Sequence, residues 1–149
     1  PRKLHAYLRG AGVEIMANSD NVLRSGCTVK HVDAKELLRV LSFESEGPAL
    51  VSGVALEPGV TLYRTPAEEF ELLKVELTET ARAVRRRAPI NSPLIVLCTE
   101  GEAFVRSETL EAEHLASGSS LYVTPGEAEV EVSGKGVLFC AAVAGGLRA

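Results

Sequence analysis

Short apolar runs separated by turn residues dominate the chain from residue 50 onward. These runs cover residues 51–56, 62–63, 70–77, 94–98, 103–105, 121–123, 130–132 and 137–143. Turn signals such as Pro58-Gly59 and Pro125-Gly126 lie between them. Many short strands at this spacing predict a mainly β sandwich or barrel, and Pro-Gly turns before alternating residues favour a jelly roll.

One helix is predicted over residues 33–42. Asp33 can act as the N-cap, and Glu36 three residues later completes a pattern close to a capping box. An apolar stripe suitable for packing follows at Ala34, Leu37, Leu38 and Leu41. The polar stretch after residue 43 indicates a boundary, so we expect residues 1–43 and 44–149 to form separate domains.

The N-terminal residues predict a β-hairpin, with strands at 4–9 and 13–17 around a Gly-Ala type II′ turn. With a two-residue loop, Tyr7 faces Glu14 across the pair. Because strand side chains alternate between faces, His5 shares a surface with both. A histidine, a tyrosine and a glutamate on one surface can form the wall of a site.

Residues 18–30 form a polar loop directly after this hairpin. Arg24 suits two-point recognition of phosphate or carboxylate, and Lys30 adds a compact positive charge. An ordinary surface loop explains the same composition and is favoured on composition alone. A second basic run, residues 85–87, is interpreted as a solvated loop tip without function.

Composition narrows the function classes. The chain has 149 residues, of which 46% are hydrophobic, and a formal net charge of −4. This balance excludes wholesale disorder and disfavours non-specific binding to nucleic acid. No apolar run approaches the ~18 residues of a transmembrane helix, so we expect no membrane partner. No signal-peptide pattern follows the first basic residues, and we expect the chain to be the C-terminal piece of a longer protein.

The cysteines and histidines show no metal-site spacing. Three cysteines without a C-x-x-C pair argue against a disulfide framework or a structural zinc cluster. Cys98 and Cys140 lie in apolar runs and are predicted to be buried free thiols of a cytoplasmic protein. His31 and His114 are interpreted as packing or solvated residues, and spacing alone gives His5 a structural role.

Two N-terminal elements resemble type I mannose-6-phosphate isomerases. The first is Leu4-His5-Ala6-Tyr7-Leu8, and the second is Ser19-Asp20-Asn21-Val22-Leu23-Arg24, followed by Gly26, Thr28, Lys30 and Asp33. The resemblance is strong over residues 4–43 and consistent beyond them, where family members end in a second cupin domain. The resemblance implies a cupin jelly-roll fold. It also implies that residues 1–43 are the last part of the catalytic cupin domain.

The resemblance also implies an activity and a site. The family interconverts mannose 6-phosphate and fructose 6-phosphate with one zinc ion, and His5 matches its last zinc ligand. Arg24 matches the catalytic arginine, while Lys30, Tyr7 and Glu14 match pocket residues that bind the sugar phosphate. The other zinc ligands, a Gln, a His and a Glu, come from the missing N-terminal part, so we expect the isolated chain to be inactive. We expect the full-length protein to be a cytoplasmic monomer.

Three residues depart from the family pattern, namely Ser25, Cys27 and Val29. Val29 replaces a proline, and since proline restrains its own φ and the preceding residue, its loss loosens the loop that positions Lys30. Two other hypotheses stay open. The chain could be a non-catalytic cupin fragment that binds a sugar phosphate, or a structural β-module in which the matched residues are idle.

Overall fold

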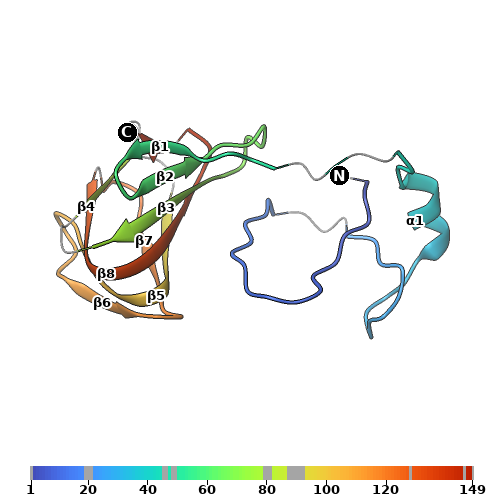
Figure 1. Cartoon of the computed structure of the whole chain (residues 1–149), viewed down its shortest axis with the longest axis horizontal. Coiled ribbons are helices and arrows are strands. Elements are labelled where there is room, and N and C mark those ends of the chain that lie inside the picture. Colours follow the sequence, from blue (N-terminus) through green and yellow to red (C-terminus); the bar gives the residue numbers. More distant parts are fainter. Residues whose placement is uncertain are drawn as a thin grey trace. The chain divides into compact units, whose positions relative to one another are not determined.

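Two units, Pro1–Leu50 and Val51–Ala149, make up the computed structural model of the protein, drawn in Figure 1. The structure describes residues 2–18, 22–44, 47, 50–78, 82–86, 93–127, 129–145 and 147–148, with the backbone alone at 82–86 and 147–148. The sequence predicted a boundary after residue 43, whereas the two units divide after Leu50.

The apolar runs of the second unit become the strands of one antiparallel sheet, which curls round on itself in Figure 1. The strands are β1 (Val54–Glu57), β2 (Val60–Tyr63), β3 (Glu71–Leu77), β4 (Arg82–Arg86), β5 (Leu94–Arg106), β6 (Glu113–Ala116), β7 (Ser120–Val123), β8 (Glu129–Ala142) and β9 (Leu147–Arg148). The predicted mainly β fold is confirmed.

Two long strands organise this sheet. β8 pairs with β5 along nearly its whole length, from Leu94 opposite Ala142 to Arg106 opposite Glu131. The other edge of β8 pairs with β3 and β4 in succession. The other edge of β5 pairs with β7 and then β6. Each long strand thus pairs with the other along one edge and with two shorter strands along its second edge.

The core follows the alternation of side chains along these strands. In β3 every second residue is buried, as the period of two requires, and in β5 the same alternation holds on either side of the bulge, at Leu94–Cys98 and again from Ala103. The fully buried side chains, those with under 2% of their surface exposed, are Leu62, Leu94, Leu138, Val75, Val96, Val105, Val130, Val132, Cys98 and Cys140. The prediction that Cys98 and Cys140 are buried free thiols is confirmed.

The sequence predicted two separate strands from the runs at 94–98 and 103–105, and this prediction is wrong. β5 continues through this position with a bulge between Cys98 and Glu100. A bulge and glycines let a strand bend without ending. The interpretation of the second basic run is also wrong at two positions, because Arg85 and Arg86 lie in β4. Arg87 lies outside the described residues.

The first unit contains helix α1, Ala34–Val40, inside the predicted range. Asp33 caps it, since its carboxylate oxygen Oδ1 accepts the Glu36 N–H at 2.9 Å. The helix stops at Leu41, whose backbone is extended. None of the helices in the described residues has the length and apolar character needed to cross a membrane.

The predicted hairpin at residues 4–9 and 13–17 is wrong. Residues 2–18 are all described and contain no strand. A lone two-stranded hairpin is marginally stable in water, and every side chain from residue 2 to residue 12 is exposed, so no packed face holds the pairing. The alternation at 13–17 nevertheless persists, because Val13, Ile15 and Ala17 are half-buried while Glu14 and Met16 are exposed.

Candidate functional site

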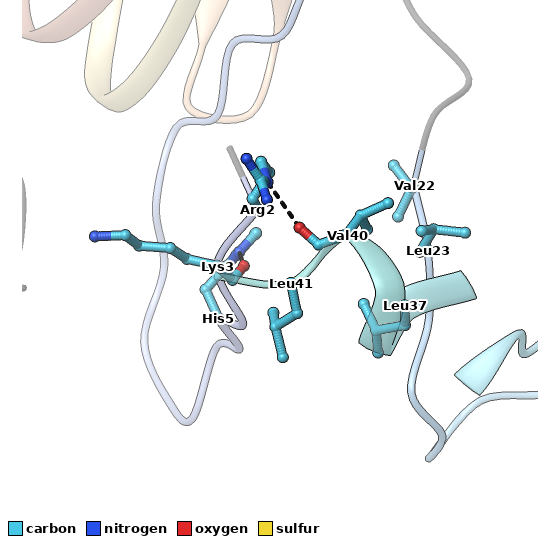
Figure 2. A pocket seen from close by; sticks show the side chains of 8 residues that line it. All are labelled: Arg2, Lys3, His5, Val22, Leu23, Leu37, Val40 and Leu41. Carbon is cyan, nitrogen blue, oxygen red and sulfur yellow. Dashed lines mark hydrogen bonds between the residues drawn. The ribbon is translucent and has the colours of Figure 1, made fainter. Parts of the chain in front are cut away.

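A pocket of about 340 Å³ lies within the first unit, beside the candidate residues (Figure 2). Its polar wall comes from the N-terminal segment, and its apolar walls come from α1 and from the loop before it. The lining residues are Arg2, Lys3, His5, Val22, Leu23, Leu37, Val40 and Leu41. Leu23 lines the pocket, and the next residue in the chain is Arg24, which is half-buried.

The imidazole of His5 is oriented by the backbone. Its Nδ1 lies 3.3 Å from the carbonyl oxygen of Lys3. A carbonyl oxygen can only accept, so this contact requires a hydrogen on Nδ1, and in the neutral ring Nε2 is then the nitrogen without one. The other nitrogen, Nε2, then has a free lone pair. This is the arrangement by which backbone carbonyls commonly hold metal-binding histidines.

Arg2 joins the start of the described chain to the end of α1. Its Nε donates to the Val40 carbonyl oxygen at 2.7 Å, and the Ser42 N–H donates to the Arg2 carbonyl oxygen at 2.8 Å. Sequence reasoning missed this residue, because no local pattern signals a partner 38 positions away. The contact places the segment that carries His5 against the helix.

Tyr7 and Glu14 meet as the sequence predicted, although the strands around them do not form. A hydrogen bond with the Glu14 carboxylate, together with its negative charge, raises the pKa of Tyr7 above its ordinary value. Tyr7 is 80% exposed, so both groups are open to a solute. The pair offers a hydroxyl and a carboxylate at one point of the surface.

The loop that carries Lys30 is held by a local hydrogen bond between a side chain and the backbone. The Lys30 N–H donates to the Thr28 hydroxyl at 3.1 Å, and Cys27 adopts a left-handed φ of 55°. Lys30 and Val29 are exposed. Within the part of the chain that the structure describes, no hydrogen bond or ion pair joins His5, Arg24 and Lys30 to one another.

The described residues do not form a complete zinc site. No group of three or more His, Cys, Asp or Glu side chains gathers among them in a way that could hold a metal ion. Zinc in proteins takes about four ligands, or three protein ligands and a water. Of the candidates, His5 alone has a free, oriented nitrogen. Among the described residues, His5 therefore offers one nitrogen that fits a position of a zinc site.

His114, the candidate histidine of the second unit, lies in a contact between neighbouring strands. His114 lies 3.1 Å from Glu102 through Nε2 and against the ring of Phe104, and all three lie on the exposed surface of β5 and β6. The prediction that His114 is solvated is consistent with its half-exposed side chain. This pair is a surface contact between neighbouring strands.

The known proteins that resemble this chain in sequence share one name. No protein-family model matches the chain. The chain is 35% identical to mannose-6-phosphate isomerase 1 of Arabidopsis thaliana over 128 residues, which is 86% of this chain and 29% of that protein. It is 33% identical to mannose-6-phosphate isomerase of Salmonella typhimurium over 135 residues, 90% of this chain and 33% of that protein. The chain thus spans about a third of these relatives.

Solved structures agree with the sequence matches. The Salmonella typhimurium enzyme bound to fructose 6-phosphate and zinc superposes with a TM-score of 0.70 at 32% identity, over 85% of this chain and 31% of that chain. Single variants of that enzyme replace a histidine, a glutamate and an arginine, spaced nine and then ten residues apart. His5, Glu14 and Arg24 have the same residue types and spacing. By sequence and by its cupin fold, the chain belongs to the mannose-6-phosphate isomerase family.

Proposed function

We propose that this chain is the C-terminal part of a zinc-dependent enzyme that interconverts mannose 6-phosphate and fructose 6-phosphate. The observation that carries the proposal is the shared spacing of His5, Glu14 and Arg24 with three residues altered in variants of the Salmonella enzyme. Two lysines and a glutamate altered in other variants lie more than 100 residues earlier in that enzyme. This agrees with a site completed by a preceding segment.

His5 is proposed as one zinc ligand. Its Nδ1 is engaged by the Lys3 carbonyl, so the Nε2 lone pair is available to a metal ion. The other ligands are proposed to come from outside this chain, because no group of three or more His, Cys, Asp or Glu side chains that could hold a metal ion gathers among the described residues. On its own, the chain is therefore proposed to be inactive as an isomerase.

Arg24 is proposed to act on the reacting sugar. The isomerisation moves a proton between two neighbouring carbons, and negative charge develops on an oxygen while this happens. A guanidinium is permanently charged and stabilises such an oxygen by two-point hydrogen bonding. Arg24 is half-buried, so its guanidinium is partly shielded from water, and it directly follows Leu23, which lines the pocket.

Lys30, Tyr7 and Glu14 are proposed to hold the substrate. Lys30 is exposed in the loop that follows Arg24 and suits the phosphate group as a compact charge. The Tyr7–Glu14 pair suits the sugar hydroxyls, because a carboxylate accepts from hydroxyl groups and a phenol can both donate and accept. Because the Tyr7–Glu14 pair is close in sequence to His5, it would help to orient the sugar at the metal.

For the isolated chain, the incomplete metal site favours binding of a sugar phosphate without catalysis. A cupin fragment that keeps Arg24 and Lys30 can still bind a sugar phosphate without turning it over. A thermal-shift titration of the 149-residue chain with mannose 6-phosphate tests this. Stabilisation that disappears in Lys30→Ala supports a binding fragment, and the absence of any shift supports an idle β-module.

The catalytic proposal is tested in the complete enzyme that contains this chain. Arg24→Ala should lower kcat by about 100-fold or more, the usual cost of losing one group that stabilises developing charge, and zinc content should not change. Arg9→Ala is the matched control, since Arg9 is an exposed arginine of the same unit. Turnover close to that of the control would remove Arg24 from the catalytic machinery. His5→Ala should lower zinc content, and full occupancy would remove His5 from the metal site.

A further inference from the structure

We propose that Arg2 is a positioning residue, which clamps the segment that carries His5 to the C-terminal end of helix α1 and so fixes the orientation of the imidazole ring. The functional meaning of this clamp rests on the proposed role of His5 as a zinc ligand. The clamp itself is a property of the first unit and can be tested without metal.

Arg2 is held to the helix end from two directions. The Arg2 guanidinium donates through Nε to the Val40 carbonyl oxygen, and the Arg2 carbonyl oxygen accepts from the Ser42 N–H, at 2.7 and 2.8 Å. Two bonds of opposite polarity from one residue fix both its position and its direction. Figure 2 shows the Arg2 side chain reaching toward Val40 at the wall of the pocket.

The charge of Arg2 suits this place. The last carbonyl groups of a helix have no partner inside the helix, and the aligned peptide dipoles make its C-terminal end negative. Val40 is the last residue of α1. A permanently charged guanidinium therefore satisfies a free carbonyl and interacts favourably with the dipole.

The backbone of Arg2 is strained, which indicates that its surroundings hold it. Its φ is 66°, in the left-handed region that side-chain-bearing residues rarely adopt. Such a conformation persists only where contacts over-determine it, and these residues often lie at functional sites. The bonds to Val40 and Ser42 are those contacts.

The clamp acts on His5 through Lys3. Arg2 directly precedes Lys3, and the Lys3 carbonyl oxygen is the partner of His5 Nδ1 at 3.3 Å. Holding Arg2 fixes the peptide that joins it to Lys3, which narrows the positions open to the Lys3 carbonyl in the next peptide. The ring is thereby held in the Nδ1–H form, with Nε2 free toward an incoming ligand.

The test compares Arg2→Gly with Arg9→Gly. Glycine adopts φ of 66° without strain, so Arg2→Gly removes the side-chain bond without adding a backbone clash. Arg9→Gly removes the same side chain from an exposed position of the same segment. The readout is the tautomer of His5 by two-dimensional ¹H–¹⁵N NMR of the metal-free 149-residue chain, at a pH where the ring is neutral.

In the unmodified chain and in Arg9→Gly, we expect His5 to be mainly in the Nδ1–H form. In Arg2→Gly, we expect a return to the mixture typical of an exposed histidine, in which Nε2–H dominates. An unchanged tautomer in Arg2→Gly, or an Nε2–H form in the unmodified chain, would overturn the clamp.

The zinc affinity of the complete enzyme distinguishes the proposed ligand role of His5 from the proposed positioning role of Arg2. Arg2→Gly should weaken zinc binding by about tenfold, as loss of an orienting partner usually does, and Arg9→Gly should not. If His5→Ala binds zinc as tightly as the unmodified enzyme, the ligand role of His5 fails while the NMR result still decides the clamp. If His5→Ala loses zinc but Arg2→Gly binds it normally, the ligand role stands and the positioning role fails.

Discussion

Gly101 of β5 lies directly opposite Gly136 of β8, and neither position has room for a Cβ atom. A Cβ on Gly136 would overlap the carbonyl oxygen of Glu100, and one on Gly101 would overlap that of Lys135. The two long strands therefore lie too close for any side chain at these two positions, next to the bulge between Cys98 and Glu100.

We expect Gly136→Ala to lower the free energy of unfolding by about 3 kcal/mol, the upper part of the range for a small residue enlarged at a packed position. The obstructing atoms belong to the backbone of β5, so they cannot rotate away. Equilibrium urea unfolding of the protein measures the loss.

Gly118→Ala is the matched control for this substitution. Gly118 has a left-handed φ of 87°, but a Cβ there meets no atom within 4 Å. It should cost only the conformational strain, about 1 kcal/mol. Equal losses in the two variants would show that steric overlap between β5 and β8 is not the cause.

The same region shows what the sequence could and could not predict about the fold. Alternation identified the buried faces of β3, β5 and β8, because a period of two is a local property. It could not tell a bulge from a turn at Glu100-Gly101, because both use the same residues. The strands β4, β6 and β9 were missed. Three of the five residues of β4 are arginines, and the four and two residues of β6 and β9 are too short to show a period.

The buried thiols give a pH dependence of stability. Burial raises the pKa of Cys140 to about 12, from an ordinary value near 9. Between these values the unfolded chain has released a proton that the folded chain keeps. Stability should therefore fall as the pH rises above about 9, by up to about 1.4 kcal/mol per pH unit from Cys140. Urea unfolding at several alkaline pH values measures the slope.

Two variants isolate the contribution of Cys140. Cys140→Val has no thiol to ionise, so its stability should fall less steeply over the same alkaline range. Cys27→Ser removes an exposed thiol and should leave the slope unchanged. A slope that is the same in all three proteins would assign the effect to other groups.

The candidate site was predictable only where its contacts are close in sequence. The Tyr7–Glu14 pair follows from a short turn between two alternating segments, and it is present even though the strands are not. The bond from Arg2 to Val40 spans 38 positions and depends on how the chain returns past the helix. Rules of local propensity and residue spacing do not predict the course of the chain over that distance, so this contact is known only from the structure.

Helix α1 should depend on its cap. We expect Asp33→Ala to destabilise the helix by about 1 kcal/mol, because the Glu36 N–H loses its acceptor. Faster hydrogen exchange of the Glu36 and Leu37 amides would report this. Asp33→Asn keeps an acceptor oxygen and should retain most of the protection. If Asp33→Ala exchanges no faster than Asp33→Asn, the cap contributes nothing measurable.

The Tyr7–Glu14 pair should be visible by titration. The hydrogen bond between the Tyr7 hydroxyl and the Glu14 carboxylate, together with the negative charge of that carboxylate, raises the pKa of Tyr7 above 10.0. We expect Glu14→Gln to lower this pKa toward the ordinary value, since glutamine keeps an acceptor oxygen but has no charge. Tyrosinate absorbance, assigned to Tyr7 by subtracting the Tyr7→Phe titration, measures the change. Glu111→Gln removes an exposed carboxylate elsewhere and should leave the Tyr7 titration unaltered. An identical Tyr7 curve in Glu14→Gln would mean that the two groups do not meet in solution, and the pair would then lose its proposed role in holding sugar hydroxyls.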